Sequence, residues 1–257
     1  QDKQLFVAGE RPMSGEELGK LGDLARAETA YVDEWIGWLL DRLTGWRLLD
    51  DTIVIIAADH GENFGEHGLL RHGLCLYDTL LRVPLVIRVP GVEQSRSVRP
   101  MVQSIDLYPT LMRLAEIDED QVSRELQGTD LIAQTEQNRF GAKAISELYR
   151  PATGLWERKV PHFMPTFRKR FDRVLRAVRT NSHKFIWSSN GEHELYDLQR
   201  DPGETHNIVR TEPTLAVQLH GELDLWLESF AHAHPQVSNT SSAAESDERE
   251  MERLRDL

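Results

Sequence analysis

One short segment of this sequence constrains the fold more than any other, the apolar run from Thr52 to Ala58. Its side chains are β-branched or small and show no polar alternation. This predicts a strand buried on both faces, as in a parallel sheet covered by helices. The run ends abruptly at Asp59, His60 and Gly61, where the glycine permits a sharp turn. Sites in open α/β sheets form beyond the carboxyl ends of the strands, so we expect polar atoms of Asp59 and His60 to lie there within about 5 Å of each other, facing an open cleft.

Asp59 and His60 offer one carboxylate and one imidazole to a divalent cation. Hard cations favour carboxylate oxygen, which makes Asp59 the first candidate metal ligand. Nitrogen ligation by His60 is less typical of calcium and suits manganese, zinc or iron better. The sequence Asp-His-Gly by itself leaves an alternative open, a pair that only caps an ordinary strand-to-helix turn.

The segments around this strand alternate between helical and strand patterns, which is typical of an α/β fold. Ser14 and Glu17 form a capping box before a long amphipathic helix that ends near Gly45. Three elements are expected after the strand: a short helix around Leu76–Leu81, a second parallel strand at Leu85–Val89, and a helix capped by Ser104 or Asp106 that reaches Ile117. We therefore predict, for residues 1–125, an α/β domain with a mainly parallel sheet flanked by helices.

The pattern changes in the second half of the chain. Short apolar runs separated by turn residues predict antiparallel strands at Leu175–Arg179, Lys184–Trp187 and His193–Leu198. The pair Asn190-Gly191 is the clearest hairpin signal, and Glu212-Pro213 opens an apolar helix. Residues 126–234 should thus form a small antiparallel sheet with a C-terminal helix, and residues 235–257 a linker and tail.

Composition bears on the partners of the chain. The 257 residues carry a formal net charge of −12, which argues against nucleic acid because phosphate neutralisation needs clustered cations. No apolar run reaches about 18 residues, so no transmembrane segment is expected. The single cysteine, Cys75, cannot form an internal disulfide and indicates little about the compartment. An acidic protein that accepts an anionic ester needs local cations at its site, and a bound metal would be the largest of them.

Several ordered motifs resemble those of the sulfatase branch of the alkaline-phosphatase superfamily and its phosphonate and phosphodiester monoester-hydrolase relatives. The family pattern is a hydrophobic strand, then S/A-D-H/N-G-E, then G-E/D-H, then a lysine or histidine, followed by downstream motifs. It is matched here by Ala58–Glu62, Gly65–His67, His72, Tyr77-Asp78, Arg82–Gly91, Ser104–Leu111, Glu194–Leu198, Asp201–Glu204 and Asn207. The resemblance covers roughly residues 16 to 230.

This resemblance implies a sulfuric ester hydrolase of the arylsulfatase type with one divalent metal ion, usually calcium in the family. Two family features are absent from the sequence: the C/S-x-P-S/A-R stretch that carries the nucleophile, and an upstream strand with an aspartate pair that completes the metal ligands. We therefore expect a C-terminal half that is inactive alone and exposes apolar strand edges or faces. Members of the family are often periplasmic or secreted.

His72 is where the chain departs from the commoner family residue, a lysine that touches the substrate. A protonated histidine can donate to a non-bridging oxygen or act as general acid to the leaving group, so we assign His72 to catalysis and, with Arg71, to substrate binding. Glu62 is expected to orient His60 through its free ring nitrogen, and His67 to support the loop. A plain solvent-facing histidine is the alternative for His72.

The expected substrate is an anionic ester, a sulfated sugar or an aryl sulfate. A phosphonate or phosphate ester hydrolase and a catalytically inactive relative that binds metal or a glycan are the main alternatives, and a lipid-linked phosphoglycerol transferase is more distant. A basic cluster could form a loop over the site, although most charge runs are solvated faces. It comprises Arg158, Lys159, Arg168, Lys169, Arg170, Arg173, Arg176 and Arg179.

Overall fold

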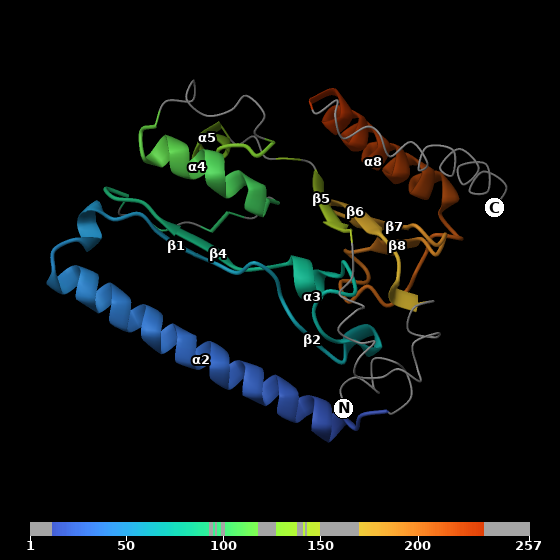
Figure 1. Cartoon of the computed structure of the whole chain (residues 1–257), viewed down its shortest axis with the longest axis horizontal. Helices are drawn as coiled ribbons and strands as arrows, with labels where there is room; N and C mark the ends of the chain where they lie inside the picture. Colours follow the sequence, from blue (N-terminus) through green and yellow to red (C-terminus); the bar gives the residue numbers. More distant parts are fainter. Residues whose placement is uncertain are drawn as a thin grey trace. The chain divides into compact units, whose positions relative to one another are not determined.

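The computed structural model describes residues 12–92, 95, 97–98, 101–117, 127–137, 141, 143–149 and 170–233. These residues form two compact units (Figure 1). The first unit holds residues 12–73, 79–92, 95 and 97–98, and the second holds residues 74–78, 101–117, 127–137, 141, 143–149 and 170–233. Asp59, His60 and His72 therefore all belong to the first unit.

The first unit begins with α2, a single helix from Gly15 to Gly45 (Figure 1). Its predicted capping box is confirmed: the backbone N–H of Glu17 donates to Ser14 Oγ at 3.2 Å, and the N–H of Ser14 donates to Glu17 Oε2 at 2.8 Å. The helix ends beside Arg47, whose φ of 59° lies in the left-handed region and turns the chain away from the helical path.

An apolar face of α2 is open to solvent. None of the residues of this helix is buried, and Leu24, Tyr31, Trp35 and Trp38 are between 48% and 63% exposed. The ring of Trp35 lies edge-to-face against Tyr31 at 6.1 Å and against Trp38 at 5.5 Å. A continuous exposed apolar surface of this kind is typical of a site that another polypeptide surface covers.

The exposed face of α2 should bind the hydrophobic dye ANS. We expect the W35Q/W38Q double variant to show much weaker ANS fluorescence than the wild type, with unchanged helix content in far-ultraviolet circular dichroism. Leu225→Gln is the matched control, because Leu225 is a 60% exposed apolar residue of the second unit. Equal dye binding by the double variant and the wild type would show that α2 is not the apolar surface.

Two short strands, β1 (Val54–Ala57) and β4 (Leu85–Arg88), form a sheet in the first unit. They pair antiparallel, so the prediction that Leu85–Val89 is a parallel neighbour is wrong. The chain reverses direction between them through a loop and α3 (Asp78–Leu81); the connection is long enough for either direction, so its length alone does not decide the pairing. β1 is half-buried rather than buried on both faces, and Val86 of β4 is 57% exposed. The expected exposure of apolar strand surface is therefore present.

The mainly parallel sheet predicted for residues 1–125 is not found in the described part of the chain, where every strand pair is antiparallel. An apolar run shows that a strand is hydrophobic on both faces, but it does not show the direction of the neighbouring strand. The coarser prediction, helices combined with sheets, holds.

A small hairpin follows β1 and lies between the candidate site residues His60 and His72 in the sequence. It consists of β2 (Asn63–Phe64), η2 (Glu66–Gly68) and β3 (Leu70–Arg71), with Asn63 opposite Arg71 in the antiparallel register. Asn63 is only 2% exposed, and its Nδ2 donates to Arg71 O at 2.7 Å while its Oδ1 accepts the Thr79 hydroxyl at 2.6 Å. The buried amide thus fixes both strands of the hairpin.

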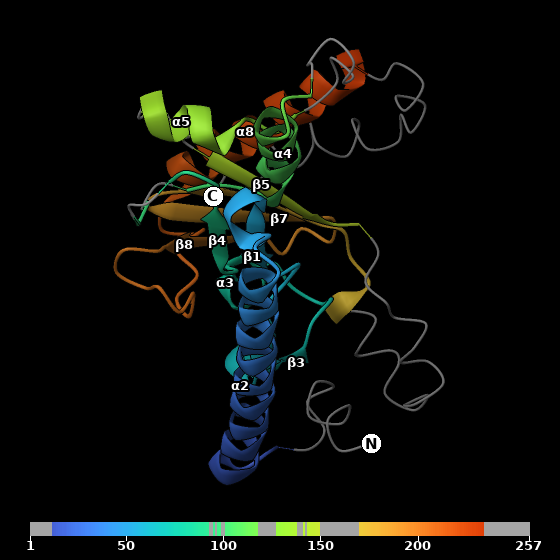
Figure 2. The same cartoon turned by 90° about the vertical axis from the view of Figure 1, so that its left-hand side faces the viewer.

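The second unit is built around a four-stranded antiparallel sheet covered by α8 (Pro213–Ala233), as Figures 1 and 2 show. Its strands, in spatial order, are β5 (Lys143–Leu148), β6 (Leu175–Thr180), β7 (His183–Ser188) and β8 (Glu194–Asp197). The predicted antiparallel strands and final helix are confirmed, whereas β5 was not predicted. Side chains alternate across β7, so Phe185 and Trp187 pack against Leu219 and Leu223 of α8, while Lys184 points to the other face.

A second helical layer of this unit consists of η3 (Ser104–Asp106), α4 (Leu107–Leu114) and α5 (Leu131–Gln137). Asp106 is buried, and its carboxylate accepts the backbone N–H groups of Gln103 and Thr129, each at 2.8 Å. Thr110 Oγ1 accepts the N–H of Leu131 at 2.9 Å. The motif Ser104–Leu111 is therefore structural here: Asp106 and Thr110 tie the start of α5 to α4.

Candidate functional site

Asp59 and His60 lie where the chain leaves the carboxyl end of β1. Asp59 Oδ1 accepts the backbone N–H of His60 at 3.0 Å, and Asp59 Oδ2 lies 3.8 Å from His60 Nε2. Both side chains reach solvent, with exposed fractions of 89% for Asp59 and 42% for His60. The predicted proximity is confirmed, and one carboxylate oxygen and one ring nitrogen are close enough to bind the same cation.

The ring of His60 is held by the backbone. Its Nδ1 lies 2.8 Å from Gly61 O, and because a carbonyl oxygen only accepts, Nδ1 must carry the proton. Nε2 then has a free lone pair, the form in which a histidine binds metal. The sequence predicted that Glu62 would orient His60, but in the structure the Gly61 carbonyl does so.

Gly61 is required by a close backbone approach rather than by a turn alone. Its N–H donates to Leu80 O at 2.8 Å, and an added Cβ would lie 2.0 Å from Thr79 O. Any side chain at position 61 would push the loop away from α3. The glycine therefore fixes the start of the site loop against that helix.

Glu62 contacts His72 across the small hairpin. His72 Nδ1 lies 3.2 Å from Glu62 Oε1 and 3.4 Å from Glu62 Oε2. On its other side, the ring of His72 packs on that of His60, with 4.2 Å between centroids and a tilt of 36°. The structure therefore brings together Asp59, His60, Glu62 and His72 in one exposed cluster.

Arg71 and His67 lie elsewhere on the hairpin. Arg71 is exposed with a φ of 69°, and its carbonyl accepts from Asn63 as described above. His67 has a φ of 55° within η2 and is half-buried in the turn between the two strands. Among the described residues, no contact places Arg71 in the cluster, and the loop-supporting role expected for His67 stays a prediction.

The donors present suit a metal but do not complete its coordination. Asp59 supplies a carboxylate oxygen and His60 an unprotonated nitrogen, which together suit a divalent cation. Among the described residues, no group of three or more histidine, cysteine, aspartate or glutamate side chains is arranged to hold a metal ion. A cation on Asp59 and His60 would therefore need ligands from outside the described residues.

Comparison with known proteins identifies the family. Residues 26–117, which include β1 and every candidate site residue from Asp59 to His72, match the sequence profile named Sulfatase. The choline-sulfatase of Rhizobium meliloti (strain 1021) is 30% identical over 183 residues, which are 71% of this chain and 32% of that protein. This chain belongs to the sulfatase family.

Two solved structures resemble this sulfatase chain. The phosphonate monoester hydrolase of Agrobacterium radiobacter is 27% identical with a TM-score of 0.61, over 78% of this chain and 39% of that one. A protein solved in complex with its substrate, D-glucosamine-2-N,6-O-disulfate, is 25% identical with a TM-score of 0.60, over 80% of this chain and 40% of that one. The chain thus spans between about a third and two fifths of the length of these three relatives, and it shares the α/β fold of the two solved structures.

The length and apolar character of its helices decide whether one of them could span a membrane. Within the described residues, none is both long enough and apolar enough to cross a membrane.

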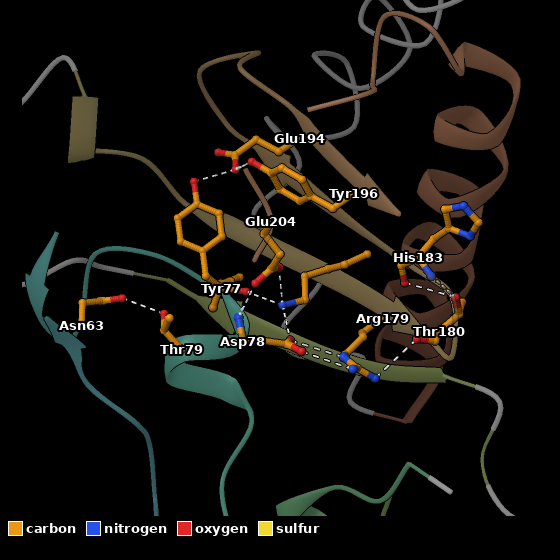
Figure 3. A network of polar contacts seen from close by, with 12 residues as sticks. Asn63, Tyr77, Asp78, Thr79, Arg179, Thr180, His183, Glu194, Tyr196 and Glu204 are labelled. Carbon is orange, nitrogen blue, oxygen red and sulfur yellow. Dashed lines mark hydrogen bonds and ion pairs between the residues drawn. The ribbon is translucent and has the colours of Figure 1, made fainter. Parts of the chain in front are cut away.

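The downstream sulfatase motifs meet in a polar network of the second unit (Figure 3). The hydroxyls of Tyr77 and Tyr196 both donate to Glu194 Oε2 at 2.8 Å, and Arg173 Nη2 lies 3.4 Å from Glu194 Oε1. Burial, followed by the charge of Glu194, raises the pKa of both tyrosines far above the ordinary value. The tyrosines therefore act as neutral donors that join residues 74–78 to β8.

Lys184 is the buried cation of this network. It is 0% exposed, and its Nζ lies 2.5 Å from Asp78 Oδ1, 2.6 Å from Glu204 Oε1 and 3.2 Å from Leu76 O. Arg179 adds a second cation at 3.2 Å from Asp78 Oδ2. Burial alone would raise the pKa of Asp78, but Lys184 and Arg179 hold it below the ordinary value.

Glu204 is the second acid that contacts Lys184, and its negative charge is less well compensated than that of Asp78. It is 2% exposed, and burial raises its pKa despite the attraction of Lys184. Its Oε2 also accepts the backbone N–H of Asp78 at 2.6 Å. The acid thus binds Asp78 directly through its backbone N–H and indirectly through Lys184, a role that no spacing in the sequence indicated.

The basic cluster does not form a free anion-binding surface in its described part. Arg173 pairs with Glu192 at 3.7 Å, Arg176 pairs with Glu147 at 2.9 Å, and Arg179 pairs with Asp78. Arg170 lies over the ring of Phe171 at 4.8 Å. Arg158, Lys159, Arg168 and Lys169 lie outside the described residues, and the substrate-loop hypothesis for them stays a prediction.

Proposed function

We propose that this sulfatase chain is the C-terminal part of a metal-dependent sulfuric ester hydrolase of the arylsulfatase type. Asp59 and His60 would hold the cation, and His72 would meet the substrate. The observation that carries the proposal is the close placement of these three side chains at the carboxyl end of β1, in a segment that matches the Sulfatase profile. The nucleophile and the remaining metal ligands would come from the part of the domain that this chain does not contain.

Calcium is proposed from the family, whereas the nitrogen of His60 also suits manganese, zinc or iron. The bound ion would polarise the ester and favour ionisation of the nucleophile. Asp59 orients its carboxylate by accepting the His60 N–H, and Gly61 keeps the lone pair of His60 Nε2 available. Both contacts lie within the chain itself and would direct the two donor atoms toward a cation.

His72 would act on the substrate itself. Half of its side chain is exposed, and in its protonated form it can donate to a sulfuryl oxygen or to the departing oxygen of the ester. The exposed Arg71 next to it would add a positive charge for the anionic ester. Together these residues would offset the overall negative charge of the chain at the place where an anion must bind.

The substrate class proposed is a sulfated sugar or an aryl sulfate. One structural relative was solved with D-glucosamine-2-N,6-O-disulfate as its substrate, and one sequence relative is a choline-sulfatase. These names support a sulfate ester as the substrate and leave its alcohol part open. The side chains of Asp59, His60 and His72 are all substantially exposed, so they do not by themselves favour one alcohol.

A phosphonate monoester hydrolase is the second candidate function. The Agrobacterium enzyme has a comparable TM-score and identity, and an Asp-His pair suits phosphonate esters as well as sulfate esters. The nucleophile would separate the two, because a formylglycine precursor indicates a sulfatase. A chain that binds metal without turnover would instead support the inactive relative.

The proposal is tested in the polypeptide that contains this chain together with the nucleophile-bearing part. We expect Asp59→Asn and His60→Ala to lose the metal and the hydrolysis of p-nitrophenyl sulfate, whereas His72→Ala should keep the metal and lose about 10²-fold or more in kcat. Metal content is measured by mass spectrometry, and phenyl phosphonate hydrolysis is measured in parallel.

His206→Ala is the matched control, because His206 is 84% exposed and belongs to the second unit. Loss of metal in His72→Ala would make His72 a ligand and contradict its assignment to the substrate. Unchanged metal content in both Asp59→Asn and His60→Ala would contradict the metal site.

A further inference from the structure

The pairing of Glu62 with His72 is a feature that no motif spacing suggested. The two residues are ten positions apart in the sequence, yet Nδ1 of His72 lies within 3.4 Å of both oxygens of the Glu62 carboxylate. Both side chains are partly exposed, at 38% for Glu62 and 52% for His72. A surface pair of this kind contributes little stability, so its geometry points to a role in orientation.

The backbone explains why these side chains meet. Asn63 and Arg71 face each other in the antiparallel hairpin, so Glu62 and His72 occupy the next pair of positions in the same register. Asn63 holds Arg71 through a part-buried hydrogen bond, and Gly61 is fixed against Leu80. Glu62 and His72 are therefore held in place by the fixed residues next to them in the hairpin.

The chemistry of the two groups fixes the position of a proton. An ionised carboxylate only accepts hydrogen bonds, so His72 Nδ1 must carry the proton shared with Glu62. The other nitrogen, Nε2, has no hydrogen-bond partner among the described residues. The ring also packs on His60, which limits its rotation.

We propose that Glu62 is the positioning residue of His72: it binds Nδ1–H and thereby presents Nε2 to the ester. This inference rests on the proposed function for its catalytic meaning, but the orientation itself does not. A lysine at position 72 would have one flexible ammonium and no ring to orient. The histidine has two distinct nitrogens, and only a fixed partner decides which of them faces the substrate.

The orientation is tested without turnover, on the 257-residue chain treated with a chelator to remove metal. Long-range ¹H–¹⁵N spectra of histidine-labelled protein, at a pH where histidines are neutral, report which ring nitrogen carries the proton. His72→Ala identifies the His72 signals among the ten histidines of the chain. We expect the Nδ1–H form in the wild type and a shift toward the Nε2–H form in Glu62→Ala.

Glu66→Ala is the matched control for the tautomer. Glu66 is an exposed acid of the same hairpin whose carboxylate accepts the N–H of Phe64, so its removal should leave the His72 signals unchanged. An Nε2–H form in the wild type, or the same form in the wild type and Glu62→Ala, would overturn the proposal. Circular dichroism of each variant shows whether the fold is retained.

The catalytic consequence is tested by a double-mutant cycle in the intact enzyme. Glu62→Ala should lower kcat by about 10-fold or more with KM little changed, but should have almost no further effect in the His72→Ala or His72→Lys background. If the fold losses in kcat of the two single variants instead multiply in the double variant, Glu62 acts independently of His72. That result would overturn the positioning role. If the enzyme hydrolyses neither ester but the tautomer result holds, the proposed function fails while the orientation of His72 by Glu62 stands.

Discussion

Replacing Lys184 with methionine should lower the free energy of unfolding of the chain by about 3–5 kcal/mol. Methionine fills a similar volume but leaves Glu204, which is 2% exposed, without its cation. Asp78 would retain Arg179, so the larger part of the loss should come from Glu204. Unfolding in urea, followed by circular dichroism and by tryptophan fluorescence, measures the change in free energy.

Lys20→Met is the matched control for this substitution. Lys20 forms a lysine–carboxylate pair of similar length, 2.7 Å to Glu16, but its side chain is 69% exposed on α2. Its replacement should change the free energy of unfolding by about 0.5 kcal/mol or less. Adding Glu204→Gln to Lys184→Met should recover part of the lost stability, because the buried charge disappears with its partner. Equal losses at positions 184 and 20 would contradict the structural importance of the buried pair.

Acidification should destabilise the second unit through His193. Burial, and then repulsion by His220, lowers the pKa of His193 to about 4. The neutral ring accepts the backbone N–H of Ser188 at Nδ1, at 3.0 Å, and protonation would break this hydrogen bond. Below the unfolded pKa of 6.5 the unfolded chain binds the proton more tightly than the folded chain, so stability falls with falling pH.

The size and range of this effect follow from the two pKa values. The contribution of neutral His193 to the free energy of unfolding is complete above pH 6.5. It is lost as the pH falls toward about 4, a total of about 3 kcal/mol. Urea unfolding at several pH values across this range should show a smaller decrease for His193→Gln than for the wild type. The exposed His206 gives the control His206→Gln, which should follow the wild type. The same pH dependence in His193→Gln and the wild type would exclude His193 as the cause.

Local patterns predicted the elements of the fold well. The capping box, the long helix α2, the antiparallel strands β6 to β8 and the opening of α8 at Pro213 all depend on residues close together in the sequence. β5 was missed because Lys143, Ser146 and Glu147 interrupt its apolar pattern. The direction of β4 could not be predicted, since strand direction depends on how the intervening chain returns.

The sequence named all four members of the cluster, but it did not predict the contacts of His72 with Glu62 and His60. Asp59 and His60 are adjacent and end a strand, so sequence alone places them together. The contact of Glu62 with His72 depends on the register of the hairpin, and the orientation of His60 depends on a backbone carbonyl. In the sequence, Lys184 cannot be distinguished from an ordinary strand lysine. Only the folded chain shows that it forms ion pairs with both Asp78 and Glu204.

The small hairpin positions residue 72 through contacts that do not involve the side chain of residue 72. Its path is set by Asn63, Gly61 and the backbone of Arg71, none of which depends on what stands at position 72. A lysine and a histidine can therefore be exchanged there during evolution without rebuilding the loop. Under the proposed function, such an exchange would change how the proton and the positive charge are supplied while the proposed metal ligands stay in place, and a single substitution would adapt one scaffold to leaving groups of different basicity.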